Sequence, residues 1–142
     1  MDLEIIFSIA GVLSMIGWLT LLASPYAPLW SDRIAGLAIP LILSAGYMAL
    51  LIFLPSNGDG GFGSLAEVTA LFSHENAVLA GWVHYLAFDL LIGAWICRTA
   101  RAENLRFWLV IPCLPLTFLL GPAGFLAFVG MRLLGRTRTF WN

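Results

Sequence analysis

Residues 76–99 read NAVLAGWVHYLAFDLLIGAWICRT, a run that is long and apolar enough to cross a lipid bilayer. A spanning helix needs about 20 predominantly apolar residues. The middle of this run nevertheless carries His84 and Asp89, and an Asp at that depth costs about 2.5–3.5 kcal/mol on insertion. On a helix, Gly81, Tyr85 and Asp89 fall in one row. His84 lies about 140° around the axis from Asp89. The run therefore predicts a membrane helix whose two ionisable groups flank Tyr85 and serve a function.

The composition of the whole chain agrees with a membrane protein. Its 142 residues are 61% hydrophobic and 11% charged, whereas soluble domains are about 25% charged. All seven basic residues are Arg and the net charge is -1, which argues against a nucleic-acid partner. The acidic start, Met1-Asp-Leu-Glu4, lacks the positive region of a secretory signal, so we expect the first apolar run to be retained. We predict a multi-pass protein of the cell inner membrane.

Four apolar runs predict an all-α fold, an integral membrane four-helix bundle forming a single transmembrane domain over residues 1–142. The spans are expected at about residues 5–23, 34–54, 76–98 and 107–131. Ser64-x-x-Glu67 resembles a capping box before an amphipathic segment, so a short interfacial helix is expected before the third span. The fourth run contains Gly121-Pro122, which predicts a broken span.

The distribution of arginine leaves the path of the fourth run open. With four spans, the arginines divide four against three between the two sides of the membrane. If residues 107–131 instead entered the membrane and returned through the Pro/Gly break, all seven would lie on the cytoplasmic side. Four spans are preferred here, because about 25 residues match one membrane crossing and two half-crossings would be short.

Two segments carry a resemblance to a known family: GWVHYLAFDLLIGAWI, residues 81–96, and LPLTFLLGPAGFLAF, residues 114–128. They resemble the bacterial branch of the abscisic-acid-deficient-four-like membrane proteins, and the resemblance spans essentially the whole chain. The plant members are required for making neoxanthin from violaxanthin in the plastid. They look similar around Asp89 and the Gly-Pro-x-Gly break and differ around His84. Because most bacteria make no neoxanthin, the resemblance implies a chemistry class rather than a substrate.

The implied chemistry is the isomerisation of a 5,6-epoxide of a carotenoid or related isoprenoid into an allenic alcohol, which demands no cofactor. One group protonates the epoxide oxygen and another removes a proton from the adjacent polyene carbon. Burial favours neutral side chains, which would make Asp89 the acid and His84 the base, with Tyr85 orienting the oxygen. These three are the candidate catalytic residues. The candidate substrate-binding residues are Ser44, Tyr47, Trp82, Phe88, Gly121, Pro122 and Gly124. No metal-ligand spacing is found in the sequence.

Other functions stay open from the sequence. The chain could be a non-catalytic subunit that binds pigment or lipid in a larger membrane complex, with Asp89 hydrogen-bonded to Ser44 or Tyr47 of another helix. A proton-linked transporter is disfavoured because no inverted repeat is visible. Haem ligation by His74 and His84 is disfavoured because ten residues separate them by about 15 Å along one helix. The expected partners are membrane lipid or carotenoid, and a homo-oligomer is considered because four helices enclose only a narrow cleft.

Overall fold

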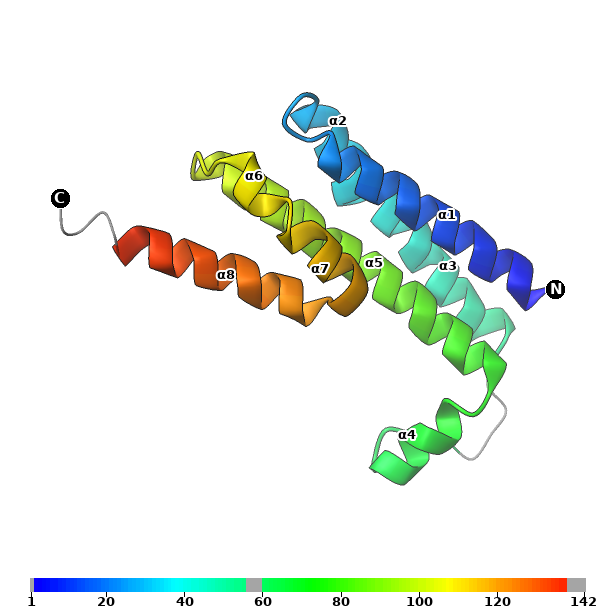
Figure 1. Ribbon diagram of the computed structural model, residues 1–142. Coiled ribbons are helices and arrows are strands. Elements are labelled where there is room, and N and C mark those ends of the chain that lie inside the picture. The colour runs from blue at the N-terminus through cyan, green and yellow to red at the C-terminus, as the bar shows by residue number, and fades with distance from the viewer. Residues whose placement is uncertain (1, 56–59, 138–142) are drawn as a thin grey trace.

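The protein is described by a computed structural model that covers residues 2–55 and 60–137, with side chains as far as Leu134 (Figure 1). Every regular element in these ranges is a helix, which confirms the predicted all-α class. The elements form an elongated assembly in which consecutive long helices run antiparallel, so that the first and third run in the same direction (Figure 1).

Three helices are long and apolar enough to cross a membrane, and they coincide with the first three predicted spans. They are α1, Leu3–Leu22; the continuous helix formed by α2, Pro28–Arg33, η1, Ile34–Ala38, and α3, Ile39–Phe53; and α5, Glu75–Ala102. Within its most apolar window α5 is 50% buried, against 28% for each of the other two. Helix α5 packs against α1 and α3, so the run with His84 and Asp89 forms the centre of the fold.

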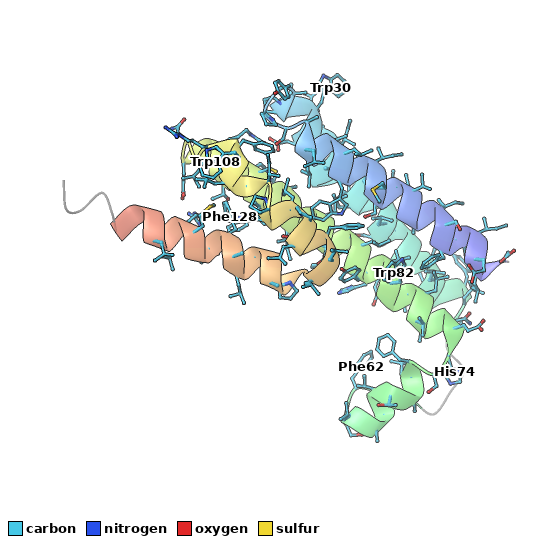
Figure 2. All side chains as sticks on the ribbon, in the orientation of Figure 1. Trp30, Phe62, His74, Trp82, Trp108 and Phe128 are labelled. Atoms are coloured by element: carbon cyan, nitrogen blue, oxygen red, sulfur yellow. The ribbon has the colours of Figure 1, made fainter. Side chains whose placement is uncertain are left out.

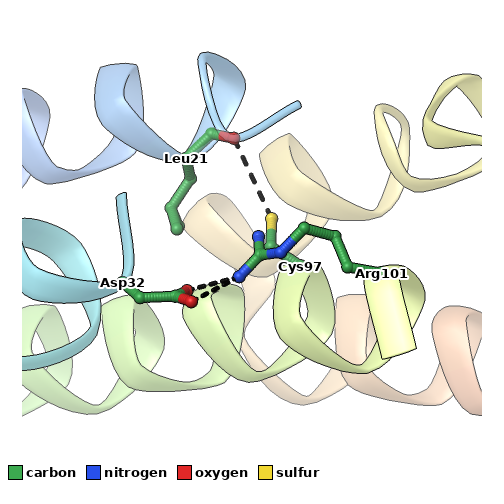
Figure 3. Close-up of polar contacts among 4 residues, drawn as sticks. All are labelled: Leu21, Asp32, Cys97 and Arg101. Atoms are coloured by element: carbon green, nitrogen blue, oxygen red, sulfur yellow. Dashed lines mark hydrogen bonds and ion pairs between the residues drawn. The ribbon is translucent and has the colours of Figure 1, made fainter. Parts of the chain in front are cut away.

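The second helix begins earlier than the sequence suggests. The sequence predicts a span from about residue 34, but the helix begins at Pro28, a residue well suited to the first helical turn. Asp32, inside this helix, binds Arg101 near the end of α5, and the Arg101 Nη2 atom lies 2.5 and 2.6 Å from the two carboxylate oxygens of Asp32 (Figure 3). The π-helical turn η1 ends two residues before Pro40, and this wider turn accommodates the missing proline N–H within a continuous helix.

The short helix expected before the third span is present as α4, Leu65–Leu71, and its interfacial position stays a prediction. Its predicted cap is confirmed, because the Ser64 hydroxyl accepts a hydrogen bond of 3.2 Å from the Glu67 N–H. Helix α4 has no buried residue, and Phe72 at its end packs against Gly81 of α5. A Cβ at Gly81 would lie 2.8 Å from the Phe72 ring, so the small residue is what lets this contact form.

The predicted fourth span over residues 107–131 is wrong, because this segment folds back on itself. It forms α6, Phe107–Val110, α7, Cys113–Leu120, and α8, Pro122–Thr137, and α7 packs against α8 as a hairpin (Figure 1). The apolar halves, Phe107–Leu120 and Pro122–Leu134, are each about 20 Å long, short of a hydrocarbon core of about 30 Å. Arg132 of α8 returns to Glu103 beside the end of α5, with Nε 2.8 Å from Oε2.

Candidate functional site at the hairpin tip

Asp89 is buried on α5 at the point where the hairpin reverses. It is 6% exposed. A Cβ at Gly121 would lie 2.6 Å from the Asp89 Oδ1 atom, so only glycine permits the backbone to approach the carboxyl this closely. Gly121 also has a φ of +33°, a conformation that side chains resist. Two independent physical reasons therefore require glycine at the hairpin tip.

The second glycine of the Gly-Pro-x-Gly segment closes the hairpin. A Cβ at Gly124 would lie 2.0 Å from the Thr117 Oγ1 atom and 2.4 Å from the Thr117 backbone nitrogen. The Thr117 hydroxyl itself is buried and donates a 2.7 Å hydrogen bond to the Cys113 carbonyl. Gly124 thus lets α8 pack directly on the backbone of α7, while Pro122 starts α8 and is exposed.

The carboxyl of Asp89 is not paired with a charge. Its Oδ2 atom is buried and has no hydrogen-bond partner among the described residues. The ion pairs among the described side chains join Arg101 to Asp32 and Arg132 to Glu103. Both pairs lie at the C-terminal end of α5, away from Asp89. A buried carboxylate without a counter-ion or a set of donors is costly, so the surroundings favour the protonated, neutral form. Such a group can donate one proton and accept one.

Tyr85 lies one turn before Asp89 and bridges α5 to the hairpin. Its hydroxyl donates a 2.7 Å hydrogen bond to the carbonyl of Phe118 in α7. In an uninterrupted helix that carbonyl would accept from the N–H of residue 122, which is a proline and has none. Tyr85 therefore satisfies a carbonyl that the hairpin break leaves free. The Tyr85 hydroxyl group is also close enough to the Asp89 carboxyl for an electrostatic interaction between the two side chains.

A pocket of about 1190 Å³ opens beside Tyr85, between α1, the start of α5 and the hairpin tip. Trp82, labelled in Figure 2, lines it and stacks on both Phe7 and Tyr85, with ring centroids 5.5 Å apart in each pair. The pocket exists because the hairpin stops partway along α5 and leaves the first half of that helix uncovered. Its lining includes Asp2, Leu3, Glu4, Phe7, Phe72, Ser73, Glu75, Val78, Leu79, Gly81, Trp82, Tyr85, Leu86, Phe118 and Leu119. Asp89 does not line the pocket and lies one helical turn beyond Tyr85.

His84 lies on another face of α5 and is exposed. Its ring centroid is 4.6 Å from that of Phe88 and 5.5 Å from that of Tyr47, which belongs to α3. Of the three candidate catalytic residues, the structure brings Tyr85 and Asp89 together and leaves His84 outside the pocket lining. A joint action of His84 and Asp89 on one bound group therefore has no geometric support here.

The seven candidate binding residues divide between these two places. Trp82 lines the pocket, and the two glycines and Pro122 build the hairpin beside Asp89. Tyr47 and Phe88 surround His84 instead, and Ser44 is exposed on α3. The suggestion that Ser44 or Tyr47 hydrogen-bonds Asp89 is wrong, because the hairpin rather than α3 packs over the carboxyl.

Sequence reasoning missed Phe118 and Phe7, which help to form the pocket. Phe118 was within reach of the sequence, because a proline four residues later leaves its carbonyl in need of a donor. Phe7 was not, since its role depends on how α1 packs against α5. Nothing in a single sequence specifies that packing.

Comparisons with known proteins agree with this arrangement. Neither the curated proteins nor the solved structures give a match to this chain. A protein-family model described as ABA DEFICIENT 4-like matches residues 5–128, which include almost all of the three long helices, the Gly-Pro-x-Gly segment and the pocket lining apart from Asp2, Leu3 and Glu4. The bacterial branch of the expected resemblance stays a prediction, but the family is confirmed, and the chain belongs to the ABA DEFICIENT 4-like family.

Proposed function

We propose that this protein is an inner-membrane isomerase that acts on a carotenoid or related isoprenoid by acid/base chemistry at Asp89. The observation that carries the proposal is a buried carboxyl, one oxygen of which has no hydrogen-bond partner among the described residues, held against Gly121 one turn from a tyrosine that lines a lipid-sized pocket. Ionisable groups at membrane depth are expensive and are by default functional candidates. Membership of the ABA DEFICIENT 4-like family supports the same class of chemistry.

The proposed membrane arrangement has three spans and one re-entrant hairpin. Helices α1, α2–α3 and α5 cross the bilayer, and α6 to α8 enter from the end of α5 and return to it. Irregular backbone at membrane depth is tolerated where protein satisfies its polar groups, as Tyr85 does for the Phe118 carbonyl. In this arrangement the hairpin tip and Asp89 lie near the middle of the membrane, and the pocket opens toward one leaflet.

The proposed reaction uses Tyr85 and Asp89 as a relay. Tyr85 gives its proton to the epoxide oxygen as the ring C–O bond breaks, and the carboxyl of Asp89 replaces that proton. The neighbouring polyene carbon then releases a proton to the Asp89 carboxylate through Tyr85, and its C–H electrons form the new double bond of the allene. The substrate gains one proton and loses one, so the reaction needs no oxidant, reductant or cofactor.

This scheme differs from the sequence-based hypothesis in one respect. His84 is replaced as the base by the carboxylate that Asp89 forms after its first proton transfer. One carboxyl can serve both steps because the two transfers occur in sequence at an oxygen and a carbon that are attached to the same epoxide carbon. Tyr85 must turn its hydroxyl from the Phe118 carbonyl toward the bound oxygen, a rotation that the open pocket beside it permits.

The test is turnover by purified protein in lipid vesicles. Isoprenoids are extracted from membranes of a strain lacking the gene and added to the vesicles, and the products are separated by chromatography with mass detection. An isomerase converts one component into another of identical mass and different retention. Asp89→Asn should lower the rate by about 10²–10⁴-fold, the usual contribution of general acid/base catalysis. Unchanged turnover in Asp89→Asn at normal abundance would end the enzymatic proposal.

Three further variants sharpen the interpretation. Tyr85→Phe removes the relay hydroxyl and should also lower turnover strongly, whereas Glu67→Gln removes a carboxylate that does not line the pocket and should not. His84→Ala distinguishes the two schemes, because a comparable loss in that variant would restore the imidazole as the base. All variants are compared at equal protein abundance in the vesicles.

A second function is a non-catalytic subunit that binds pigment or lipid within a membrane complex. The observation in its favour is that Asp89 does not line the pocket, whose walls are mainly apolar and aromatic. A pigment or lipid that copurifies in constant ratio and is recovered unchanged from both wild type and Asp89→Asn would favour this function over the isomerase.

A further inference from the structure

The charges of the described residues are segregated along the molecule. Asp2 and Glu4 start α1, Glu67 lies on α4 and Glu75 starts α5, and these elements meet at one end (Figure 1). The opposite end contains the arginines of the described side chains, Arg33, Arg98, Arg101, Arg106 and Arg132. Two acids at that end, Asp32 and Glu103, are paired with arginine. The hairpin makes this segregation possible, because it returns α8 to the arginine-rich end.

Arginine-rich ends of membrane proteins face the cytoplasm. The acidic end therefore faces away from it, and the pocket between α1 and the start of α5 lies on that side. The hairpin blocks the pocket from the arginine-rich side, because Phe118 and Leu119 at its tip form part of the lining. A ligand thus has access from one leaflet only.

The mouth of the pocket carries three carboxylates, from Asp2, Glu4 and Glu75, and the lining contains no Arg. Deeper in, the walls are apolar and aromatic as far as Tyr85. This gradient matches an amphiphile with a hydrophobic stem and a polar end. Carboxylates accept hydrogen bonds and repel negative charge, so they discriminate between end groups.

We propose that the pocket is loaded from the leaflet opposite the arginine-rich end, by an amphiphile whose polar end donates hydrogen bonds and carries no negative charge. The inference concerns the ligand of the pocket used in the proposed function and requires only binding, not turnover. Hydroxyl and ammonium end groups share the required chemistry. Carboxylate and phosphate end groups are rejected at the mouth.

The size of the discrimination follows from elementary electrostatics. Two unit charges about 7 Å apart in water interact by about one RT, which changes an affinity about threefold. Three mouth carboxylates together therefore disfavour an anionic end group by about twentyfold at low ionic strength. Removing two of them should reduce the discrimination by about sevenfold.

The binding experiment uses three probes with the same nitroxide-labelled alkyl chain and an ammonium, hydroxyl or carboxylate end. Quenching of Trp82 fluorescence reports occupancy of the pocket in zwitterionic bilayers, and Trp82→Phe identifies its share of the signal. The hydroxyl probe should bind better than the carboxylate probe by about twentyfold, and the ammonium probe, which the same carboxylates attract, should exceed the carboxylate probe by a larger factor. Equal binding of hydroxyl and carboxylate probes, or stronger binding of the carboxylate, would overturn the proposal.

The variant Glu4→Gln with Glu75→Gln tests the cause of the preference. It leaves Asp2, whose side chain caps α1 through the Glu4 N–H, in place. The ratio of hydroxyl to carboxylate affinity should fall about sevenfold. Glu67→Gln is the matched control, because it removes a carboxylate at the same end that does not line the pocket. A ratio that is the same in both variants would contradict the role of the mouth.

The leaflet is tested by labelling in intact cells with a maleimide that does not cross membranes. Both native cysteines are buried, so the wild type supplies a low background. Ser73→Cys at the pocket mouth should label from outside, and Ala102→Cys at the other end of α5 should label only after permeabilisation. The reverse pattern would overturn the assigned leaflet. These assays measure ligand binding and side-chain accessibility. Their results therefore decide the pocket proposal even if Asp89→Asn shows that turnover does not depend on the carboxyl.

Discussion

The contact between Gly121 and Asp89 gives the sharpest prediction about the hairpin. Gly121→Ala introduces a methyl group 2.6 Å from the Asp89 Oδ1 atom and places a side chain on a residue with a φ of +33°. Holding a non-glycine residue in such a conformation costs about 1–3 kcal/mol. Forcing an extra methyl into a packed site costs about 1–3 kcal/mol more. The free energy of unfolding should therefore fall by about 2–5 kcal/mol in total.

The two contributions can be separated with a double-mutant cycle. Asp89→Ala removes the oxygen that the new methyl group meets, so in that background Gly121→Ala should cost only the backbone term, about 1–3 kcal/mol. The difference between the two backgrounds is a coupling energy of about 1–3 kcal/mol. Unfolding is followed by tryptophan fluorescence during titration with a denaturing detergent in mixed micelles.

Gly130→Ala is the matched control. Gly130 lies within α8, and a Cβ there meets nothing within 4 Å. Since alanine is the better helix former, this variant should be neutral or stabilised by as much as about 1 kcal/mol. If Gly121→Ala changes the unfolding free energy as little as Gly130→Ala does, or if its cost is the same with and without Asp89, the described hairpin tip is wrong.

Five more substitutions, two of them used as second-site changes, test the contacts that hold the hairpin. Tyr85→Phe leaves the Phe118 carbonyl without its donor and should lower the unfolding free energy by about 1–3 kcal/mol, measured by the same titration. Gly124→Ala should destabilise the hairpin through its contact with Thr117, and Thr117→Ala should restore part of the loss because it removes the oxygen 2.0 Å from the new methyl group. Glu103→Gln should lower the denaturation midpoint by weakening the return of α8 through Arg132, and adding Arg132→Gln should lower it little further.

Much of the fold could be read from the sequence. The first three spans follow from length and hydropathy, and the α4 cap follows from Ser64 and Glu67. The break at Gly121-Pro122 also follows from the sequence, but the reversal of the chain at this break does not. A run of about 25 apolar residues has the length of one crossing, and length alone cannot distinguish a kinked span from a hairpin. The distribution of arginine between the two sides of the membrane favours the hairpin, whereas the length of the apolar run favours one crossing.

The site was predictable only in part for a related reason. Periodicity along α5 places Tyr85 and Asp89 in one row and His84 on another face, as the structure shows. It does not say which face meets another helix. The hairpin packs over Asp89, whereas His84 is exposed beside Tyr47 and Phe88. The role of each residue follows from these neighbours, which only the three-dimensional arrangement provides.

Infrared difference spectroscopy of Asp89 in bilayers tests the central claim most directly. In the proposed function this carboxyl is neutral, and a ligand in the pocket changes its surroundings through Tyr85. It predicts a carbonyl stretch of a protonated carboxylic acid that is present in the wild type, absent in Asp89→Asn, and shifted when the hydroxyl-ended probe binds. A wild-type spectrum that lacks this band, or a band that does not move on binding, would contradict the account.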